Sequence, residues 1–358
     1  MNYKKNIVNI IAGSALALSL AYGTVGCGSS SGGNSEISAP EQTPIPPIII
    51  KNKNMQEGVQ ITSWWHNDYI MPALDNTLDK MLNLGVESVS FLATQYQDNT
   101  NSTAIYPINQ KTPQDSGLET AIAKAKSRGM KTVLKPHVDP LSGWRTDITF
   151  SSEADWAAWF ANYNTFIMHY AQMAEDNGVD LFVVGTELKG TSQRQEWNQI
   201  IDNIRSVYSG KIVYAANHDE YRNVPFWDKV DYIGVDAYFE LTNSLDPTPA
   251  ELDAAFQPIA SELQQFSQQK SKKVIFTEIG YQSYDGTNVT PWWAPTSTPD
   301  QQEQADCYDA AFRAFFNKDW VEGMYFWDTH WNMADLDGFG FVNKQAESVV
   351  DDWYHKSD

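Results

Sequence analysis

Eight short runs of aliphatic and aromatic residues alternate with longer amphipathic segments over most of this 358-residue chain. Short apolar runs of this kind are typical of strands buried on both faces, as in parallel sheets. The strand-like runs are 58–64, 86–94, 132–138, 181–187, 211–217, 232–238, 273–278 and 321–328. Helix-like segments lie between them at 118–128, 153–176, 195–208 and 301–316, and Gly129, Gly178 and Gly210 follow the first three as helix stops. A strand followed by a helix, repeated in this way, predicts a single (β/α)8 TIM barrel.

An open, doubly wound parallel sheet is the alternative fold for such an alternating pattern. A nucleotide-binding sheet of that kind has a glycine-rich turn directly after its first strand. In this chain the first run passes into Ser63-Trp64-Trp65-His66-Asn67, which contains no glycine. The sequence therefore favours the barrel.

The first 26 residues have the features of an export signal, because Lys4 and Lys5 precede an apolar stretch that is followed by small residues. The apolar stretch is too short for a membrane-spanning helix. Cys27 comes next and resembles the cysteine of a bacterial lipoprotein cleavage site. We therefore expect an exported protein that is lipid-anchored through Cys27 to the bacterial membrane or cell surface. Ordinary signal cleavage, leaving a secreted protein, is the alternative.

Residues 27–54 are rich in Ser, Gly, Pro and Asn, which predicts a flexible tether and leaves residues 55–358 as one domain. Cys307 is the only other cysteine. If Cys27 carries a lipid, no disulfide can form, so the stability of the domain must come from its core.

The formal net charge of −20 argues against nucleic acid, whose phosphates require a basic surface, and it also disfavours acidic polysaccharides. Thirteen Trp and seventeen Tyr supply aromatic faces on which neutral sugars can lie flat. We therefore expect a neutral polysaccharide or oligosaccharide as partner, membrane contact only through the lipid anchor, and a monomer.

Two glutamates, Glu187 and Glu278, end the fourth and seventh strand-like runs, each directly after a threonine. The carboxyl ends of the strands carry the chemistry in a TIM barrel, and strands four and seven face each other across its mouth. Paired carboxylates are the working groups of glycoside hydrolases, and a separation of about 5–5.5 Å leads to retention of configuration. The alternative is that each is a rim glutamate held by a salt bridge.

Several segments between residues 58 and 354 resemble, in order, the motifs of glycoside hydrolase family 113. The segments are Leu134-Lys135-Pro136-His137-Val138-Asp139, Gly185-Thr186-Glu187-Leu188, Tyr232-Ile233-Gly234-Val235-Asp236-Ala237-Tyr238, Phe276-Thr277-Glu278-Ile279-Gly280-Tyr281, Gln304-Ala305-Asp306-Cys307-Tyr308, Gly323-Met324-Tyr325-Phe326-Trp327 and Lys344-Gln345-Ala346-Glu347. The resemblance implies an endo-acting, retaining β-1,4-mannanase with Glu187 as general acid/base and Glu278 as nucleophile. We expect neither a cofactor nor a metal.

The residues around this pair suggest how the sugar is bound. Tyr238 is the expected hydroxyl that orients Glu278, and Trp327 resembles the tryptophan under the sugar that is cleaved. Thr186 stands where many members of the wider clan carry an Asn that binds the sugar 2-hydroxyl. We expect Asn217 or His137 to supply that contact instead.

Aromatic residues outside the pair are candidates for further sugar contacts. Trp64, rather than Trp65, is expected to face the barrel mouth. Trp144-Arg145 and Trp292-Trp293 lie in predicted loops after strands three and seven, where they can line flanking subsites or merely cap the barrel.

Three other functions are open at this point. The strand-end histidines His66, His137, His218 and His330 suggest a metal-dependent hydrolase, but no His-x-His on the first strand and no His-Glu-x-x-His helix supports it. A tethered, non-catalytic glycan-binding lipoprotein is the second, although both acids are present. A retaining hydrolase of another neutral β-glycan is the third.

Overall fold

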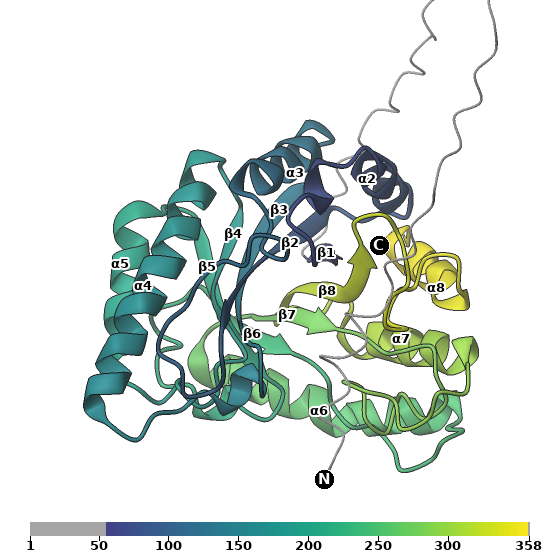
Figure 1. Cartoon of the computed structure of the whole chain (residues 1–358). Helices are drawn as coiled ribbons and strands as arrows, with labels where there is room; N and C mark the ends of the chain where they lie inside the picture. Colours follow the sequence, from purple (N-terminus) through teal and green to yellow (C-terminus); the bar gives the residue numbers. More distant parts are fainter. Residues whose placement is uncertain (1–54, 357–358) are drawn as a thin grey trace, which may run out of the picture. The chain divides into compact units, whose positions relative to one another are not determined.

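Residues 55–356 are described by the computed structural model, and within them eight parallel strands pair in chain order and close into a barrel (Figure 1). The strands are β1 (Gln56–Thr62), β2 (Ser88–Gln97), β3 (Lys131–Pro140), β4 (Leu181–Thr186), β5 (Lys211–Asn217), β6 (Tyr232–Asp236), β7 (Val274–Ile279) and β8 (Val321–His330). Pairing of β8 with β1 completes the ring. The predicted (β/α)8 barrel is thereby confirmed.

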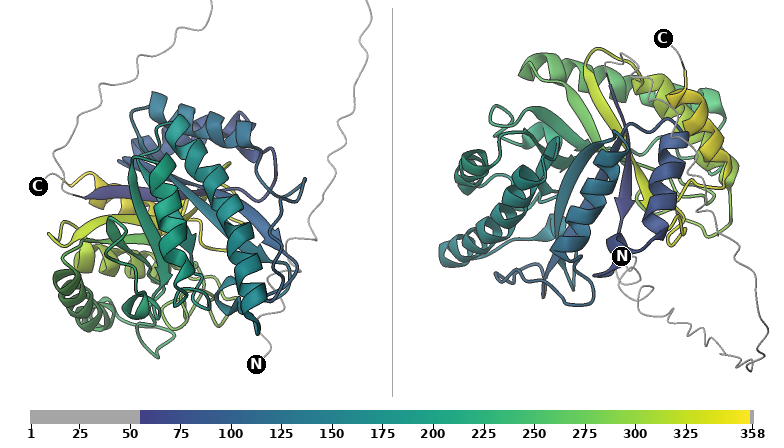
Figure 2. Two further views of the ribbon diagram at one scale, coloured as in Figure 1. Left: turned by 90° about the vertical axis from the view of Figure 1, so that its left-hand side faces the viewer. Right: turned by 90° about the horizontal axis from the view of Figure 1, so that it is seen from above.

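The helices cover the outside of the barrel, as the two further views in Figure 2 show. They are α2 (Ala73–Asn83), α3 (Asp115–Ser127), α4 (Glu153–Asp176), α5 (Glu196–Val207), α6 (Pro249–Lys270), α7 (Gln301–Phe315) and α8 (Gln345–Tyr354), with short 3-10 turns η2 (Asp68–Ile70), η3 (Arg145–Asp147) and η4 (Tyr221–Asn223). None of these helices is long and apolar enough to cross a bilayer. The predicted signal peptide, Cys27 and the tether lie outside the described residues.

The barrel contains two separate apolar clusters. A large one lies between the sheet and the helices, and a small one consists of Val133, Leu181, Val183, Val213, Ala215, Ile275 and Tyr325. Apart from Ala215, the members of the small cluster sit in the first halves of β3, β4, β5, β7 and β8. Because this cluster fills one end of the barrel, the carboxyl ends of the strands are left for polar side chains.

The strand ends differ from the predicted ones by a few residues, and the differences fall at the mouth. β1, β4 and β6 stop before Trp64, Glu187 and Tyr238, which were each expected to be the last residue of a strand. β8 instead continues three residues beyond Trp327, which was expected near its end. Three of these rim residues therefore lie in the loops that follow their strands, whereas Trp327 lies within β8.

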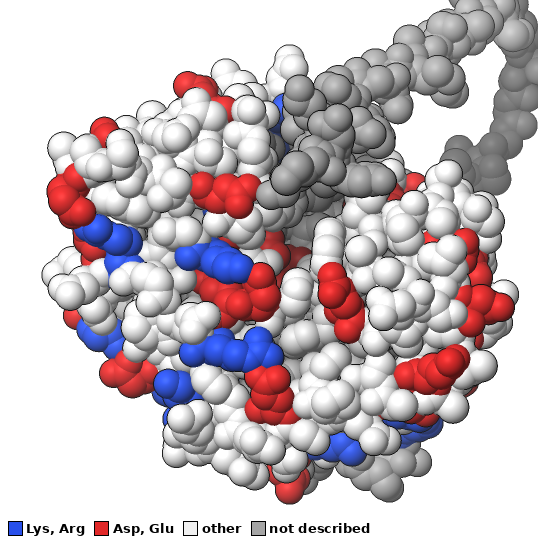
Figure 3. Space-filling view, turned by 90° about the horizontal axis from the view of Figure 1, so that it is seen from below, with Lys and Arg blue, Asp and Glu red and all other residues white. Residues whose placement is uncertain are grey.

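The surface carries acidic and basic side chains in mixed groups. On the face drawn in Figure 3, uncharged residues predominate and Lys or Arg frequently lie beside Asp or Glu. Ion pairs such as Lys189 with Asp219 and Arg194 with Glu153 show the same mixing at the level of single contacts.

Candidate active site

Glu187 follows the last residue of β4 and has a left-handed backbone conformation, with φ of 53°. This conformation is strained for a residue with a Cβ and persists only where the surroundings hold it. The N–H of Glu187 donates to the carbonyl oxygen of Ala215 at 2.8 Å, and the Tyr214 hydroxyl accepts from the N–H of Leu188 at 3.1 Å. These bonds fix the turn, and Glu187 as a whole is buried, with 6% exposure.

Glu278 lies inside β7, one residue before its end, and both oxygens of its carboxylate accept hydrogen bonds. The Tyr238 hydroxyl donates to Oε2 at 2.8 Å, and the Lys135 ammonium donates to Oε1 at 2.5 Å. Two donors, one of them charged, favour the ionised form of a buried carboxylate. The contact from Tyr238 is the orienting bond that the sequence analysis expected.

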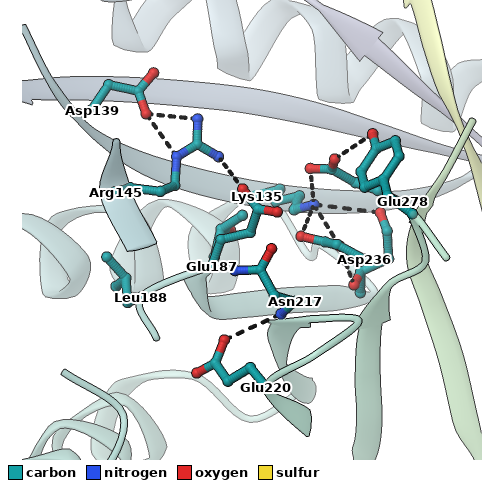
Figure 4. A network of polar contacts seen from close by, with 12 residues as sticks. Lys135, Asp139, Arg145, Glu187, Leu188, Asn217, Glu220, Asp236 and Glu278 are labelled. Atoms are coloured by element: carbon teal, nitrogen blue, oxygen red, sulfur yellow. Dashed lines mark hydrogen bonds and ion pairs between the residues drawn. The ribbon is translucent and has the colours of Figure 1, made fainter. Parts of the chain in front are cut away.

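Lys135 and Asp236 complete this part of the site, and the sequence analysis did not identify them. Figure 4 shows the ammonium of Lys135 between the carboxylates of Glu278 and Asp236, with its Nζ 3.2 Å from Asp236 Oδ1. Asp236 also accepts a hydrogen bond from the Thr277 hydroxyl at 2.7 Å. A lysine inside an apolar strand was the available signal, because fully buried lysines are almost always paired.

Arg145 brings a second cation to the site, from the loop after β3. Its guanidinium forms an ion pair with Asp139 at 2.6 Å and lies 3.6 Å from Glu187 Oε2. Burial raises the pKa of Glu187 well above its ordinary value, Arg145 opposes that rise, and the Glu278 carboxylate adds to it. Since burial is the largest of these causes, Glu187 keeps its proton to a higher pH than an exposed glutamate.

Two buried polar side chains near the pair have unused hydrogen-bonding atoms. The two ring nitrogens of His137 and the Nδ2 of Asn217 have no hydrogen-bond partner among the described residues. Figure 4 places the Asn217 amide beside Glu187. Burial, with Arg145 and Lys135, lowers the pKa of His137 well below its ordinary value, so its ring is neutral. Buried polar groups are rarely left unpaired, which makes both residues candidates for contact with ligand hydroxyls.

Trp327 presents an aromatic face at the mouth. Its ring is half-buried in a strand whose adjacent residues are buried, and it lies parallel to the His137 ring, with 6.5 Å between centroids. The Trp64 ring lies 6.4 Å from it, whereas Trp65 is exposed. Gly280, directly after β7, lets the chain approach this strand closely, because a Cβ there would lie 2.3 Å from the Trp327 carbonyl oxygen.

The loop tryptophans lie in two different settings. Trp144 is exposed, and the Arg145 guanidinium lies 5.1 Å from its ring centroid. Trp292 is also exposed and stacks on the ring of His218, with an interplanar angle of 10°. Both can therefore offer a flat apolar surface next to the mouth.

A cavity of about 790 Å³ lies outside the barrel, between the loop after β2 and α4, and contains neither glutamate. Gln95, Asn109, Gln114 and Asn162 are among the polar residues of its wall. The candidate active site is therefore the group of carboxylates at the strand ends and not this cavity.

Three carboxylates form the possible cation-binding group within the described residues. Oxygens of Asp285, Asp300 and Glu303 all lie within 4.8 Å of one another. Both oxygens of Glu303 already accept N–H bonds from Gly286 and Asn288, and Asp300 caps the start of α7. The group thus holds the loop between β7 and α7, and the four strand-end histidines are not part of it.

Comparison with known proteins gives matches over most of the chain. The model for Glycoside Hydrolase Family 113 matches residues 63–345. A complex structure of a GH113 β-1,4-mannanase is 25% identical, with a TM-score of 0.77 and coverage of 85% of this chain and 100% of that one. A second GH113 β-1,4-mannanase structure is 26% identical, with a TM-score of 0.76 and the same coverage.

A third solved structure, the GH113 β-mannanase AaManA from Alicyclobacillus acidocaldarius in complex with ManMIm, is 24% identical. Its TM-score is 0.76, and the match covers 85% of this chain and 98% of that one. Among curated protein sequences, no match was found. Because the family match extends over well more than half of the chain, this protein belongs to glycoside hydrolase family 113 and is a glycoside hydrolase.

Proposed function

We propose that this protein cleaves β-1,4-linked mannan and mannooligosaccharides with retention, with Glu278 as nucleophile and Glu187 as general acid/base. The contrast between the two buried glutamates carries the proposal. Glu278 has a hydrogen-bond donor on each carboxylate oxygen, as an ionised nucleophile requires. Burial raises the pKa of Glu187, as a group that must deliver a proton near neutral pH requires.

The proposed reaction uses Glu278 as an anion and Glu187 as a protonated acid. A Glu278 oxygen attacks the anomeric carbon while Glu187 transfers its proton to the leaving glycosidic oxygen, which gives a covalent glycosyl-enzyme and a free sugar chain end. Glu187 is then ionised and takes a proton from water, whose oxygen attacks the anomeric carbon and releases Glu278. Two inversions at one carbon restore the β configuration.

Sugar binding is assigned to the aromatic face and the unpaired polar groups. Trp327 is proposed to lie under the sugar that is cleaved, with Trp64 at its edge and Trp144 and Arg145 lining a flanking subsite. The Thr186 hydroxyl lies 3.5 Å from the Pro136 carbonyl oxygen, so it points towards the backbone. We therefore assign the 2-hydroxyl contact to Asn217, with His137 as the second unpaired partner.

The 2-hydroxyl contact can be tested with a substrate that lacks this group. Asn217→Ala is expected to reduce kcat/KM on an aryl β-mannoside about 10- to 100-fold, because a lost hydrogen bond in a buried site costs about 1–3 kcal/mol. On the matching 2-deoxy substrate the variant and the parent protein are expected to react equally fast. An equal loss on both substrates would contradict the assignment.

Mannan as the substrate is supported by the two GH113 β-1,4-mannanases that are 25% and 26% identical over 85% of this chain. The activity is tested by reducing-sugar release from mannan, glucomannan, xylan and cellulose by the parent protein and by Glu278→Ala. Release from mannan that is lost in the variant is the expected outcome. Binding of a β-glycan without release from any of them would favour a glycan-binding protein, and release from another glycan would replace mannan as substrate.

Retention is tested independently of the sugar by proton NMR of the first product formed. A β-anomer is expected before mutarotation. An initial α-anomer would rule out the covalent intermediate at Glu278.

We also propose that the catalytic domain is exported and anchored by a lipid on Cys27, with residues 1–26 as signal peptide and 27–54 as tether. The cysteine after an apolar, lysine-led segment supports this. Metabolic labelling with a fatty-acid analogue in a bacterial host is expected to label the chain but not Cys27→Ala. Equal labelling of both would exclude this anchor.

A further inference from the structure

One buried ammonium serves two buried carboxylates at the floor of the site. Lys135 has no exposed surface, and its Nζ lies 2.5 Å from Glu278 Oε1 and 3.2 Å from Asp236 Oδ1. The three residues belong to β3, β6 and β7, and they meet only because the barrel closes. With both acids ionised, this group would carry a net charge of −1 away from water.

Burial disfavours such an uncompensated charge, so one of the two acids should hold a proton. Asp236 is suited to do so, since it is completely buried and shares Lys135 with its neighbour. Burial, and then the Glu278 carboxylate, raise the pKa of Asp236 to about 7. Near and below this pH, Lys135 has a single anionic partner, which is Glu278.

The other charged and titratable groups around Glu278 come from the loop after β6 and from three further parts of the barrel. They are Tyr238 after β6, Glu187 after β4, Arg145 in η3 and Asp328 in β8. Arg145 is paired with Asp139 and Glu187, and Asp328 accepts a hydrogen bond from Thr62 at 2.6 Å. Lys135 is therefore the cation in direct contact with Glu278 among the described residues.

We propose that Lys135 and Asp236 are positioning residues that set the charge of the nucleophile. Lys135 keeps Glu278 ionised, and Asp236, by holding a proton itself, leaves Glu278 as the single anionic partner of Lys135. When Asp236 does ionise, its negative charge faces the acid/base and helps to hold the proton on Glu187. The roles of the two glutamates rest on the proposed function, whereas the charge relation rests on the contacts alone.

The pH profile of kcat/KM on an aryl β-mannooligosaccharide tests this with two variants of nearly unchanged size. Lys135→Met removes the cation next to Glu278, so the acid limb of the profile is expected to move to higher pH by about one unit or more. Asp236→Asn removes an anion that faces Glu187, so the alkaline limb is expected to move to lower pH, while the acid limb does not rise. The two variants thus shift the profile in opposite directions.

A structural role alone would lower activity or thermal stability in both variants and leave the limbs in place. The matched control is Lys80→Met, which breaks a partly exposed ion pair with Glu347 on the outside of the barrel and is expected to leave both limbs unchanged. The proposal would be overturned if both limbs of the variants' pH profiles stayed within a few tenths of a pH unit of those of the parent protein. Shifts of the two variants in the same direction would overturn it as well. If Lys135→Met does not fold, the proposal is tested by Asp236→Asn alone, because the alkaline limb of that variant must move to lower pH.

A substrate-independent measurement separates this proposal from the proposed function. The carboxyl carbons of labelled glutamates are followed by 13C NMR against pH, and the Glu278 signal is assigned by its loss in Glu278→Gln. Its titration midpoint is expected to be higher in Lys135→Met than in the parent protein, and an unchanged midpoint would refute the charge relation. Lack of hydrolysis of any β-mannan by the parent protein would instead refute the proposed function.

Discussion

The two glutamates at the mouth differ in how the barrel holds them. Glu278 sits within a strand, with one donor on each carboxylate oxygen, from Tyr238 and Lys135. Glu187 sits just past a strand in a strained turn, and its cationic neighbour Arg145 lies at 3.6 Å and is shared with Asp139. Equal side chains at equivalent strand ends have thus received unequal surroundings.

The protonation behaviour of a carboxyl group depends on its environment and not on its residue type. A carboxyl group with close donors is stabilised as an anion, and one that is mainly desolvated retains its proton. The two environments fit the proposed double displacement, which requires one ionised and one protonated acid at the same pH.

The strongest test of the contrast is removal of the well-held acid. Glu278→Ala is expected to lower kcat/KM on mannan by about 10⁴-fold or more, because no other group can form the covalent intermediate. Added azide should restore turnover of an activated aryl substrate and give the α-glycosyl azide. A β-glycosyl azide from this variant would mean that the roles of the two acids are reversed.

Removal of the other acid should have a smaller effect that depends on the leaving group. Glu187→Ala is expected to lower kcat/KM on mannan about 10²- to 10⁴-fold, since only proton transfer is lost. On an aryl substrate with a good leaving group, the first step should be nearly normal. Azide is expected to give the β-glycosyl azide here, and equal losses on both substrates would argue against an acid role.

The donors on Glu278 can be probed one at a time. Tyr238→Phe is expected to lower kcat about 10- to 100-fold, because a hydrogen bond to a charged group contributes about 1.5–3 kcal/mol. The control is Tyr221→Phe, whose hydroxyl donates to Glu262 at 3.1 Å in a contact between η4 and α6. Equal effects of the two substitutions on kcat would show that the bond to Glu278 has no special part.

The smallest expected change concerns the weaker partner of Glu187. Arg145 lowers the pKa of Glu187, so Arg145→Gln should raise that pKa further and move the alkaline limb of the kcat/KM profile up by about one pH unit. Arg194→Gln, which removes ion pairs with Glu153 and Glu196, serves as the control with an unchanged limb. A fall of the limb in Arg145→Gln would mean that Arg145 does not act on Glu187 as a cation.

Much of the fold was predictable because strand and helix patterns are local. Helix α4 and strand β5 have the predicted bounds, and all eight strands were identified in order. The errors lie at strand ends. The predicted β1 and β6 extend too far, to Trp64 and Tyr238, because the side-chain pattern continues after the pairing with neighbouring strands has stopped.

The site was predictable in part. Positions at strand ends were enough to select Glu187, Glu278 and Tyr238 as neighbours of one mouth. Lys135 and Asp236 were missed, because a polar residue inside an apolar run gives no indication of its partner. The chain separation of Lys135 and Glu278, 143 residues, shows why no local pattern could reveal that contact.

The barrel, its polar rim and the two strand-end glutamates are predictable from the sequence alone, because all three follow from periodicity and from which residue ends each strand. The charged groups around each acid, in contrast, are set by the tertiary structure. Closure of the barrel brings Lys135 to Glu278 and Arg145 to Glu187, and it removes all four side chains from water. Desolvation and close charges determine protonation, and both arise only when distant segments pack together.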